Sequence, residues 1–378
     1  MKNFILIIIF IICIFWFFNF CELQKHNVYH DVPLNIPPTY LYDTNPSVTN
    51  MIDTFNTIET QGTNYKINIK DGGYTYFRYL GIPFINHIQS FGYWENRVVF
   101  GHTTHDLWHY SFNMSERMNA FRTSSKCYRN KTWIHPAGGQ IIGEYFVYGS
   151  SDTIGYFSFT NGAVLITNMR ADDTKPIKIL ISRPGYESNA AVGIVDVPAD
   201  WIFQQQSEFP DVLGLSSQKK YIVAIVNFRE KYLDLYRSIP TNDALYNLES
   251  EDFTKFGKFY FSGSGKHKYH NIALFRDNDN NIWFIGFDGN QNDTNVNLIK
   301  LSSQDTEASC IINFYTSANP SNIRTFLAEN TSINRKISGK YGAGAIFDGD
   351  GRMNLFITER VISKRKKTFG DVLYNHWR

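Results

Sequence analysis

The sequence lacks the short motifs that identify several large enzyme classes. It contains no G-x-S-x-G elbow, no H-E-x-x-H pair and no glycine-rich phosphate-binding loop. Each of these motifs supplies a nucleophile, a metal site or a phosphate cradle at fixed spacing, so their absence removes the easiest routes to a catalytic assignment. We therefore favour a protein without catalytic activity, and an enzyme with a less recognisable site remains the alternative.

An excess of charge of one sign is also missing. Lys and Arg number 37 and Asp and Glu number 35, which gives a formal net charge of +2. This balance produces no broad positive field, so nucleic acid is excluded as an expected partner. The one basic run, 364–367, is typical of a solvated turn. Charged residues make up 19% and hydrophobic residues 43% of the chain, which predicts a folded body with a sizeable core.

Cysteine is scarce, with four in the whole chain. Cys13 and Cys21 lie in or beside the N-terminal apolar run, which leaves Cys127 and Cys310. In an oxidising compartment these two residues can form one disulfide. Two buried free thiols are the alternative.

The N-terminus carries the longest hydrophobic run. Lys2 precedes an apolar segment from Phe4 to Phe18, and Glu22 is the first acidic residue. A run of this length is typical of a secretory signal peptide, whereas a membrane-spanning helix needs about 20 apolar residues. We predict a signal peptide over 1–21 and a secreted, extracellular protein, with a retained membrane anchor as the alternative. Four sequons fit a secreted glycoprotein, or arise by chance: Asn113, Asn130, Asn292 and Asn330.

The rest of the chain divides into a leader and one domain. Residues 22–60 are rich in proline and asparagine, which predicts an irregular leader that lies along the surface of the domain. The predicted domain spans 61–378. Within the domain, an apolar run, a polar turn and a second apolar run recur, which is typical of a β-hairpin. These hairpins lie at 97–112, 145–159, 221–238, 272–287 and 343–358.

The recurrence predicts an all-β fold, a β-propeller of about five to seven four-stranded blades. A pair of β-sandwiches is the alternative, although no change in composition marks a second domain. Helical periodicity is confined to 243–256 and 322–329, where we expect short helices in loops between blades.

A second repeat points to the centre of the ring. The segment that begins at His87 is similar to the segment that begins at His135, and the comparison pairs Gln89 with Gln140. The strand before each of these hairpins would be the innermost strand of its blade, which lines the central channel. The same reasoning places 270–271 and 342–344 at the axis.

Two elements carry a resemblance to a known group of proteins. The sequence G-Q-x-x-G-E-Y at 139–145, and A-G-A-I followed by G-R and T-E at 343–359, are similar to elements of secreted β-propeller proteins of uncharacterised function. The resemblance covers most of residues 85–360 and implies the propeller fold. Its motifs describe blades and imply no chemistry.

The polar residues predicted at the axis form a candidate ligand site. Their imidazole and amide groups donate and accept hydrogen bonds without fixed charge, which suits sugar hydroxyls or a polar small molecule. The alternative is that they hold channel waters and bond to one another. The candidate ligand-binding residues are His87, Gln89, His135, Gln140, His270 and Asn271.

No metal or cofactor is expected. His102, His105 and His109 would project from different faces of a hairpin, without a carboxylate or cysteine that completes a zinc site. The segments 277–281 and 348–351 resemble calcium loops in composition, but neither has a Glu at the spacing of an EF-hand. Asp, Asn and Gly favour tight turns, so we predict turns, with a weak calcium contact as the alternative.

A hydrolase on this ring would need two carboxylates about 5–10 Å apart. No spacing selects a pair among the acids near strand ends, which are Asp152, Asp196, Asp234, Asp288 and Glu359. The aspartate-box turn of sialidase-like propellers is also missing, because Gly155 follows 150–152 one residue late.

The function predicted from the sequence is a secreted binding module for a carbohydrate or an extracellular protein, at the central pocket or one face. The alternatives are a glycosidase-like hydrolase and a structural extracellular protein. A carbohydrate site predicts exposed aromatic rings beside the polar cluster, with Trp94, Trp108 and Tyr110 as candidates. A membrane contact is expected only if the N-terminal segment is retained.

Overall fold

The structure is a computed structural model, and it describes most of the strands together with the turns and short helices between some of them. The described residues are 48–60, 63–70, 88–94, 97–102, 106–111, 118–124, 133–153, 159–169, 178–184, 189–200, 218–227, 232–260, 269–289, 293–301, 312–315, 323–327, 342–348, 351–358, 363–366 and 369–377.

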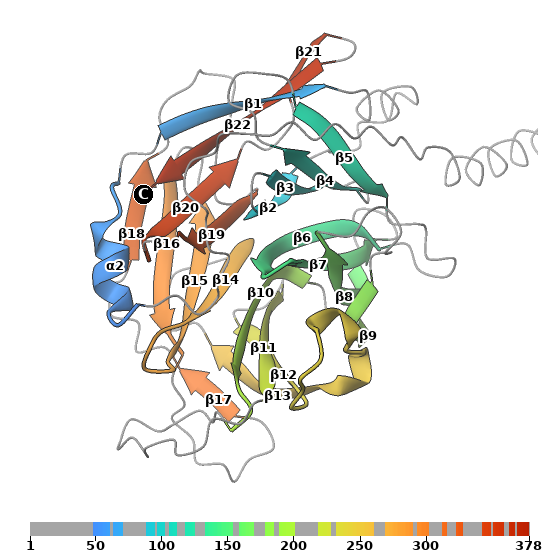
Figure 1. Cartoon of the computed structure of the whole chain (residues 1–378), viewed down its shortest axis with the longest axis vertical. Helices are drawn as coiled ribbons and strands as arrows, with labels where there is room; N and C mark the ends of the chain where they lie inside the picture. The colour runs from blue at the N-terminus through green and yellow to red at the C-terminus, as the bar shows by residue number, and fades with distance from the viewer. Residues whose placement is uncertain are drawn as a thin grey trace, which may run out of the picture.

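The described strands form five antiparallel sheets of four strands around a common centre, which is a five-bladed propeller (Figure 1). Blade 1 contains β2 (Ile88–Trp94), β3 (Arg97–His102), β4 (Asp106–Ser111) and β5 (Met118–Ser124). Blade 2 contains β6 (Trp133–Ile142), β7 (Tyr145–Thr153), β8 (Phe159–Asn168) and β9 (Lys178–Pro184). Blade 3 contains β10 (Asn189–Pro198), β11 (Lys219–Asn227), β12 (Tyr232–Ser238) and β13 (Phe253–Tyr260).

Blade 4 contains β14 (Asn271–Arg276), β15 (Ile282–Gly289), β16 (Asp293–Lys300) and β18 (Ile323–Leu327). Blade 5 contains β19 (Ala343–Phe347), β20 (Met353–Thr358), β22 (Phe369–Trp377) and β1 (Thr63–Lys70). Two short strands extend these sheets, because β17 (Ile312–Tyr315) pairs in parallel with β13 and β21 (Ser363–Lys366) pairs with β22.

The two ends of the chain close the ring in blade 5. Strand β1 comes from the N-terminal part of the chain and pairs antiparallel with β22 from the C-terminal part, from Thr63↔His376 to Lys70↔Phe369. Strand β1 also pairs in parallel with β5, which joins the outer edges of blades 5 and 1. The closure therefore couples the start and the end of the domain through backbone hydrogen bonds.

The innermost strands of the five blades meet at the axis. Strands β2, β6, β10, β14 and β19 contact one another in this order around the ring, and β6 also contacts β14 across it. Small residues permit this approach. A Cβ on Gly344 of β19 would lie 2.5 Å from the Phe91 carbonyl oxygen of β2, closer than real Cβ atoms come. The contacts among five sheets exclude the alternative of two packed sandwiches.

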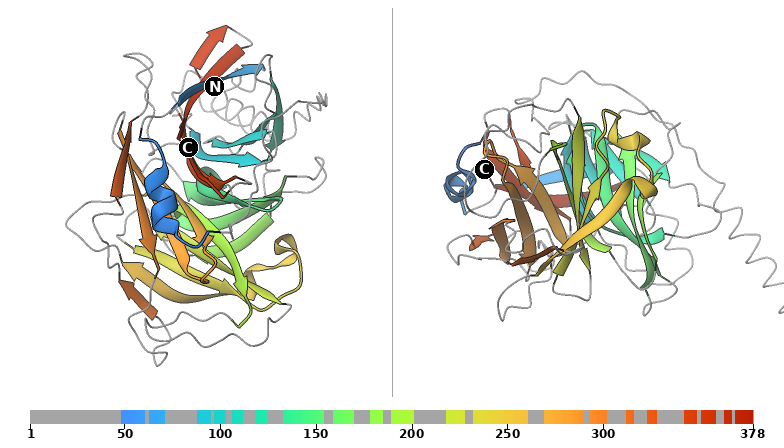
Figure 2. Two further views of the ribbon diagram at one scale, coloured as in Figure 1. Left: turned by 60° about the vertical axis from the view of Figure 1, so that its left-hand side comes forward. Right: turned by 90° about the horizontal axis from the view of Figure 1, so that it is seen from below.

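Helix α2 (Met51–Thr57) belongs to the body of the molecule. Asn50 caps it by accepting a hydrogen bond from the Asp53 backbone N–H, and Met51 and Phe55 are buried in the apolar cluster between blades 4 and 5. Figure 2 shows the helix, in blue, beside the strands of blade 4. The predicted leader over 22–60 thus ends in a segment that fills a blade interface. In the part of the chain that the structure describes, no helix has the length and apolar character needed to cross a bilayer.

One predicted helix is wrong and another is confirmed in part. Residues 322–329 were expected to be helical, but β18 (Ile323–Leu327) pairs with the edge of β16 instead. An open sheet edge offers backbone hydrogen bonds that a short, weakly amphipathic segment gains as a strand. Within 243–256 the structure has the 3-10 turns η2 (Leu245–Asn247) and η3 (Ser250–Asp252), followed by β13. They connect two strands of blade 3, so their predicted place between blades is wrong.

The register of the inner strands corrects the internal repeat. The hairpin pairs Trp94↔Arg97 and Ile142↔Tyr145 are equivalent, so Gln140 aligns with Gly92 and not with Gln89. Sequence similarity without a fixed turn position left the register open by several residues.

Candidate functional site

The candidate ligand site lies where the inner strands begin, and there blades 2 and 4 approach each other closely. A Cβ on Gly138 of β6 would lie 2.4 Å from the His270 carbonyl oxygen and 2.8 Å from Asn271 Oδ1. Asn271 is fully buried at the start of β14, and His270 before it is half-buried. Glycine is required at 138 because any side chain would collide with the backbone of the opposite blade.

Gln140, two residues after Gly138 on β6, forms hydrogen bonds across the axis of the ring. Its Oε1 accepts hydrogen bonds from the Ile194 and Leu274 backbone N–H groups, at 2.8 Å each, and its Nε2 donates to the Leu274 carbonyl oxygen at 2.8 Å. One amide therefore binds the inner strands of blades 3 and 4 from a position on blade 2. The described inner strands pair with one another at the axis only where β6 meets β10, at Gly138↔Ala191, and Gln140 supplies partners for three further backbone groups.

Blade 1 contributes polar residues to the same end of the ring. Gln89 and Ser90 of β2 are both buried. Gly342, at the start of the blade 5 inner strand, brings the chain so close that a Cβ there would lie 3.1 Å from the Ser90 carbonyl oxygen. The described wall at this end thus consists of amide, hydroxyl and backbone groups.

Several predicted residues lie outside what the structure describes. His87, His105, Glu359, both candidate disulfide cysteines Cys127 and Cys310, residues 1–47 and the sequon residues Asn113, Asn130, Asn292 and Asn330 are outside the described residues. For His135, Asp152, Trp94, Trp108 and Tyr110 the description covers the strand and not the side chain. The roles predicted for these residues stay predictions.

Acidic residues are rare on the described inner strands. Asp196 of β10 is the one carboxylate in those five strands, and it lies beyond the Ile194 contact of Gln140, away from the strand starts. Asp288 is the second-last residue of β15, the second strand of blade 4. Asp234 is remote from the axis, on the third strand of blade 3. The described acids therefore do not form a pair facing across the axis.

Asp234 belongs to a buried ionic cluster that the sequence did not reveal. The side chains of Asp234 and Arg183 are completely inaccessible to solvent and form an ion pair between β12 and β9. Lys255 of β13, with 26% of its side chain exposed, places Nζ 2.6 Å from the second carboxylate oxygen. The signal in the sequence was an acid inside the apolar alternation of 232–238, which is the pattern of a buried carboxylate in need of a cation.

The two calcium-like segments are turns with the same construction. The Asp277 carboxylate accepts hydrogen bonds from the Asn281 N–H at 2.8 Å and from Trp283 Nε1 at 2.7 Å. Asp348 accepts from the Arg352 N–H at 2.9 Å, and Asn354 Nδ2, six residues after it, lies 3.4 Å away. Both turns have a positive φ at the third residue after the aspartate. These bonds explain why Asp begins each turn, and the predicted weak calcium contact stays a prediction.

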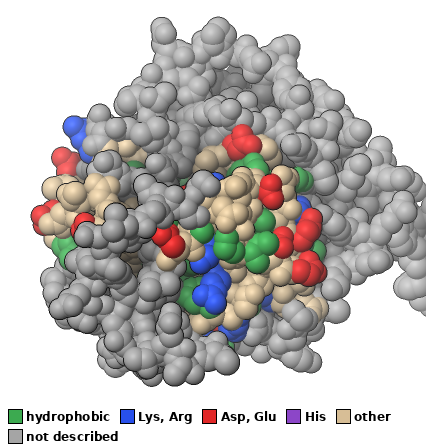
Figure 3. Space-filling model, turned by 60° about the horizontal axis from the view of Figure 1, so that its bottom comes forward, with side chains coloured by type: hydrophobic (Ala, Val, Ile, Leu, Met, Phe, Trp, Pro, Cys, Tyr) green, Lys and Arg blue, Asp and Glu red, His purple; other side chains and the backbone are tan. Residues whose placement is uncertain are grey.

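One face of the molecule is mixed in charge. Figure 3 shows acidic and basic side chains next to hydrophobic ones on the described part of the face turned forward, in keeping with a formal net charge of +2. Among the described residues, no group of three His, Cys, Asp or Glu side chains is placed to hold a metal ion.

Comparison with known proteins adds little to this picture. A crystal structure of a GH43_1 enzyme from Xanthomonas citri is similar, with a TM-score of 0.35 and 8% sequence identity over 77% of this chain and 88% of that chain. This likeness is too distant to carry an argument, so the propeller assignment rests on the strand pairings. No family model matches the sequence, and no curated protein matches it.

Proposed function

We propose that this protein is a secreted β-propeller binding module whose ligand docks where the inner strands begin. The observation that carries the proposal is the position of Gln140, whose three hydrogen bonds join blades 2, 3 and 4 at the axis. A ligand that enters at the end where the inner strands begin would meet the hydrogen-bonded Gln140 side chain before it could pass along the axis. Binding at the end of the ring is therefore favoured over transit or chemistry deep inside it.

The chemistry at this end favours a carbohydrate over a protein partner. Gln89, Ser90 and Asn271 are uncharged, and they donate and accept hydrogen bonds as sugar hydroxyls require. Protein interfaces are often centred on arginine anchors, which the described wall at this end does not contain. The aromatic rings that a carbohydrate site also predicts are Trp94, Trp108 and Tyr110, whose side chains lie outside the described residues. A glycosidase-like hydrolase needs two carboxylates, and the described inner strands supply Asp196 alone.

A glycan array probed with the full chain tests the ligand class. The matched variants are His270→Ala, at the proposed site, and Arg276→Ala, at the opposite end of the same strand. We expect binding to a defined glycan that His270→Ala weakens about tenfold, the loss of roughly one hydrogen bond, and that Arg276→Ala leaves unchanged. Equal losses in both variants, or no glycan bound, would contradict a carbohydrate site at this end.

The same protein is incubated with a panel of aryl glycosides. Absence of turnover is the expected result. Turnover that Asp196→Asn abolishes would replace the binding module with the hydrolase.

Secretion is tested by the mass of the mature protein. Expressed with its own N-terminus, the protein should appear in the medium and begin after Cys21. Recovery of the full-length chain in the membrane fraction would establish a retained anchor instead.

A further inference from the structure

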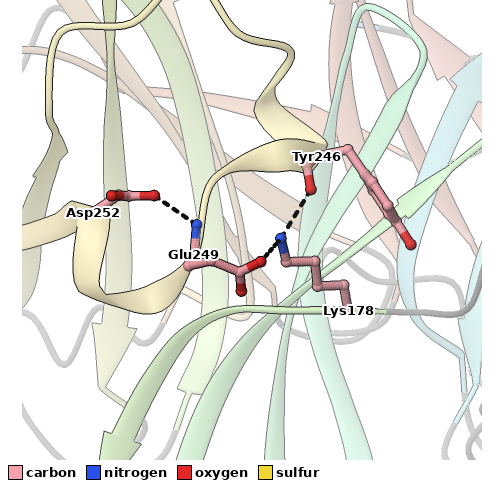
Figure 4. A network of polar contacts seen from close by, with 4 residues as sticks. All are labelled: Lys178, Tyr246, Glu249 and Asp252. Carbon is pink, nitrogen blue, oxygen red and sulfur yellow. Dashed lines mark hydrogen bonds and ion pairs between the residues drawn. The ribbon is translucent and has the colours of Figure 1, made fainter.

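The connection between β12 and β13 leaves its own blade and lies against the outer strand of blade 2. We call residues 245–252 the clasp. Lys178 of β9 donates a hydrogen bond to the Tyr246 carbonyl oxygen at 3.0 Å and forms an ion pair with Glu249 at 2.6 Å (Figure 4). The Asp252 carboxylate accepts a hydrogen bond from the Glu249 N–H at 2.8 Å, which stabilises the turn that presents Glu249.

One of these contacts involves the backbone of β9 itself. The Ser182 N–H donates to Ser250 Oγ at 3.0 Å. Backbone N–H groups lie in the plane of a sheet, so this bond leaves β9 on the side opposite β8. Strand β9 is the last strand of blade 2 and pairs with β8 alone among the described strands. The clasp therefore occupies the open edge of blade 2.

An open edge strand is a template for pairing with another chain. The outer strands of blades 1 and 5 pair with each other over two residues, Ile69↔Met118 and Lys70↔Asn119, and the outer strand of blade 3 pairs with β17. Among the described strands, β9 has no neighbour beyond β8. We propose that the clasp is an edge guard, which prevents the edge of β9 from pairing with the same edge of a second copy of this protein.

The free energies of the clasp contacts indicate whether the clasp stays on β9 permanently or is released under changed conditions. The ion pair of Lys178 with Glu249 is solvent-exposed, with 64% of the Glu249 side chain accessible, and such pairs contribute about 0–1 kcal/mol. Leu245 and Leu248 are 0% and 3% exposed in the core between blades 2 and 3. Burying each leucine contributes about 1.5–3 kcal/mol. The leucines hold the clasp in place, and the polar contacts align it on β9, so release by a change in salt, or by a change in pH near neutrality, is not expected.

Leu248→Ala in the full chain tests the guard, with Leu233→Ala as the matched control. Leu233 is fully buried between blades 3 and 4, away from the clasp. Hydrogen exchange of residues 178–184 should accelerate about tenfold or more in Leu248→Ala, beyond the change in Leu233→Ala. Sedimentation should show concentration-dependent self-association in Leu248→Ala that exceeds both the control and the wild type.

Ser250→Ala provides a milder test if Leu248→Ala fails to fold. It removes the acceptor of the Ser182 N–H and keeps the leucines, so exchange should accelerate over 178–184 and not over α2. Unchanged exchange of 178–184 in both clasp variants would overturn the proposal. Self-association of equal extent in the two leucine variants would also overturn it, because destabilisation alone would then explain the association.

Discussion

The junction between blades 2 and 3 and the junction between blades 4 and 5 are built from different kinds of side chain. Between blades 2 and 3, an apolar cluster is joined by the buried pair of Arg183 with Asp234 and by the clasp. Between blades 4 and 5, the apolar cluster includes Met51 and Phe55 of α2, and its Trp283 donates a hydrogen bond to the Asp277 carboxylate. The junction between blades 2 and 3 includes the β12–β13 connection. The junction between blades 4 and 5 includes α2, which precedes β1.

The two junctions differ in what their side chains contribute: one kind of contact orients the blades, and the other kind stabilises the fold. A buried ion pair returns little net free energy, because desolvation of both charges offsets their attraction. An apolar helix inserted between two sheets contributes in proportion to the area that it buries. The hypothesis is that the charges fix how blade 2 sits on blade 3, whereas α2 stabilises the ring at the place where it closes.

Replacing the buried Phe55 side chain of α2 by alanine should give the largest loss of stability. Phe55 is 0% exposed, and replacing a buried phenylalanine by alanine costs about 3–5 kcal/mol through lost burial and the cavity that remains. Phe55→Ala should therefore lower the free energy of unfolding in urea by that amount. Ile52→Ala on the outer face of the same helix, where Ile52 is 36% exposed, is the control and should change it by less than about 0.5 kcal/mol. A small loss for Phe55→Ala would show that α2 is not a structural part of the ring.

Loss of the buried carboxylate should cost nearly as much, for a different reason. Asp234→Asn leaves Arg183 buried without a counter-charge, and breaking a buried pair in this way costs about 3 kcal/mol or more. The double variant Arg183→Met with Asp234→Leu removes both charges and should recover most of the loss in the same urea titration. A double variant as unstable as the single one would mean that the pair itself supplies stability, against the hypothesis.

The sequence was sufficient for the fold class because its signals are local. Alternating apolar runs such as 221–228 and turns such as 348–351 specify hairpins within about twenty residues. The strand β18 was mistaken for a helix, because its pairing with β16 depends on an edge that the segment itself does not encode.

The candidate site was predicted in outline only. The hairpin pattern predicted 270–271 on an inner strand; the inner strand β14 begins at Asn271, and His270 directly precedes it. The contact of Gly138 with the backbone of blade 4 depends on the radius of the ring, which no local pattern records. The pair of Arg183 with Asp234 joins residues 51 positions apart in the sequence, and Gln140 reaches Leu274 over 134 positions. Only the closed ring brings such residues together.

A smaller effect should follow from removing the exposed charge of the clasp. Glu249→Gln weakens the ion pair with Lys178, so thermal unfolding at low ionic strength should show a loss of about 0.5 kcal/mol. In about 1 M salt the loss should vanish, because the Debye length falls to about 3 Å. Glu251→Gln, an exposed carboxylate of the same clasp, is the control and should be neutral. A loss that persists in high salt would point to packing and not to charge.

Alkaline pH should give the smallest effect, and it should separate the two junctions. Burial and then the hydrogen bond and charge of Glu144 raise the pKa of Tyr145 to about 12, and its ring stacks on Tyr246 of the clasp. The folded state therefore keeps its proton above the usual pKa of about 10. Stability from this group is full below pH 10 and is lost as pH rises towards 12, because the unfolded state releases the proton first.

The buried cluster between blades 4 and 5 contains no tyrosine among its described residues, so it has no equivalent group to titrate. Hydrogen exchange measured between pH 9 and 11.5, and corrected for its intrinsic rate, should show residues 245–252 opening before 51–57. Tyr145→Phe should reduce the difference, since it keeps the ring and removes the ionisable hydroxyl. Tyr221 of the same cluster, whose pKa is also raised by burial, keeps a part of it. If α2 opens first at alkaline pH, the apolar junction is the weaker one and the division between alignment and stability is wrong.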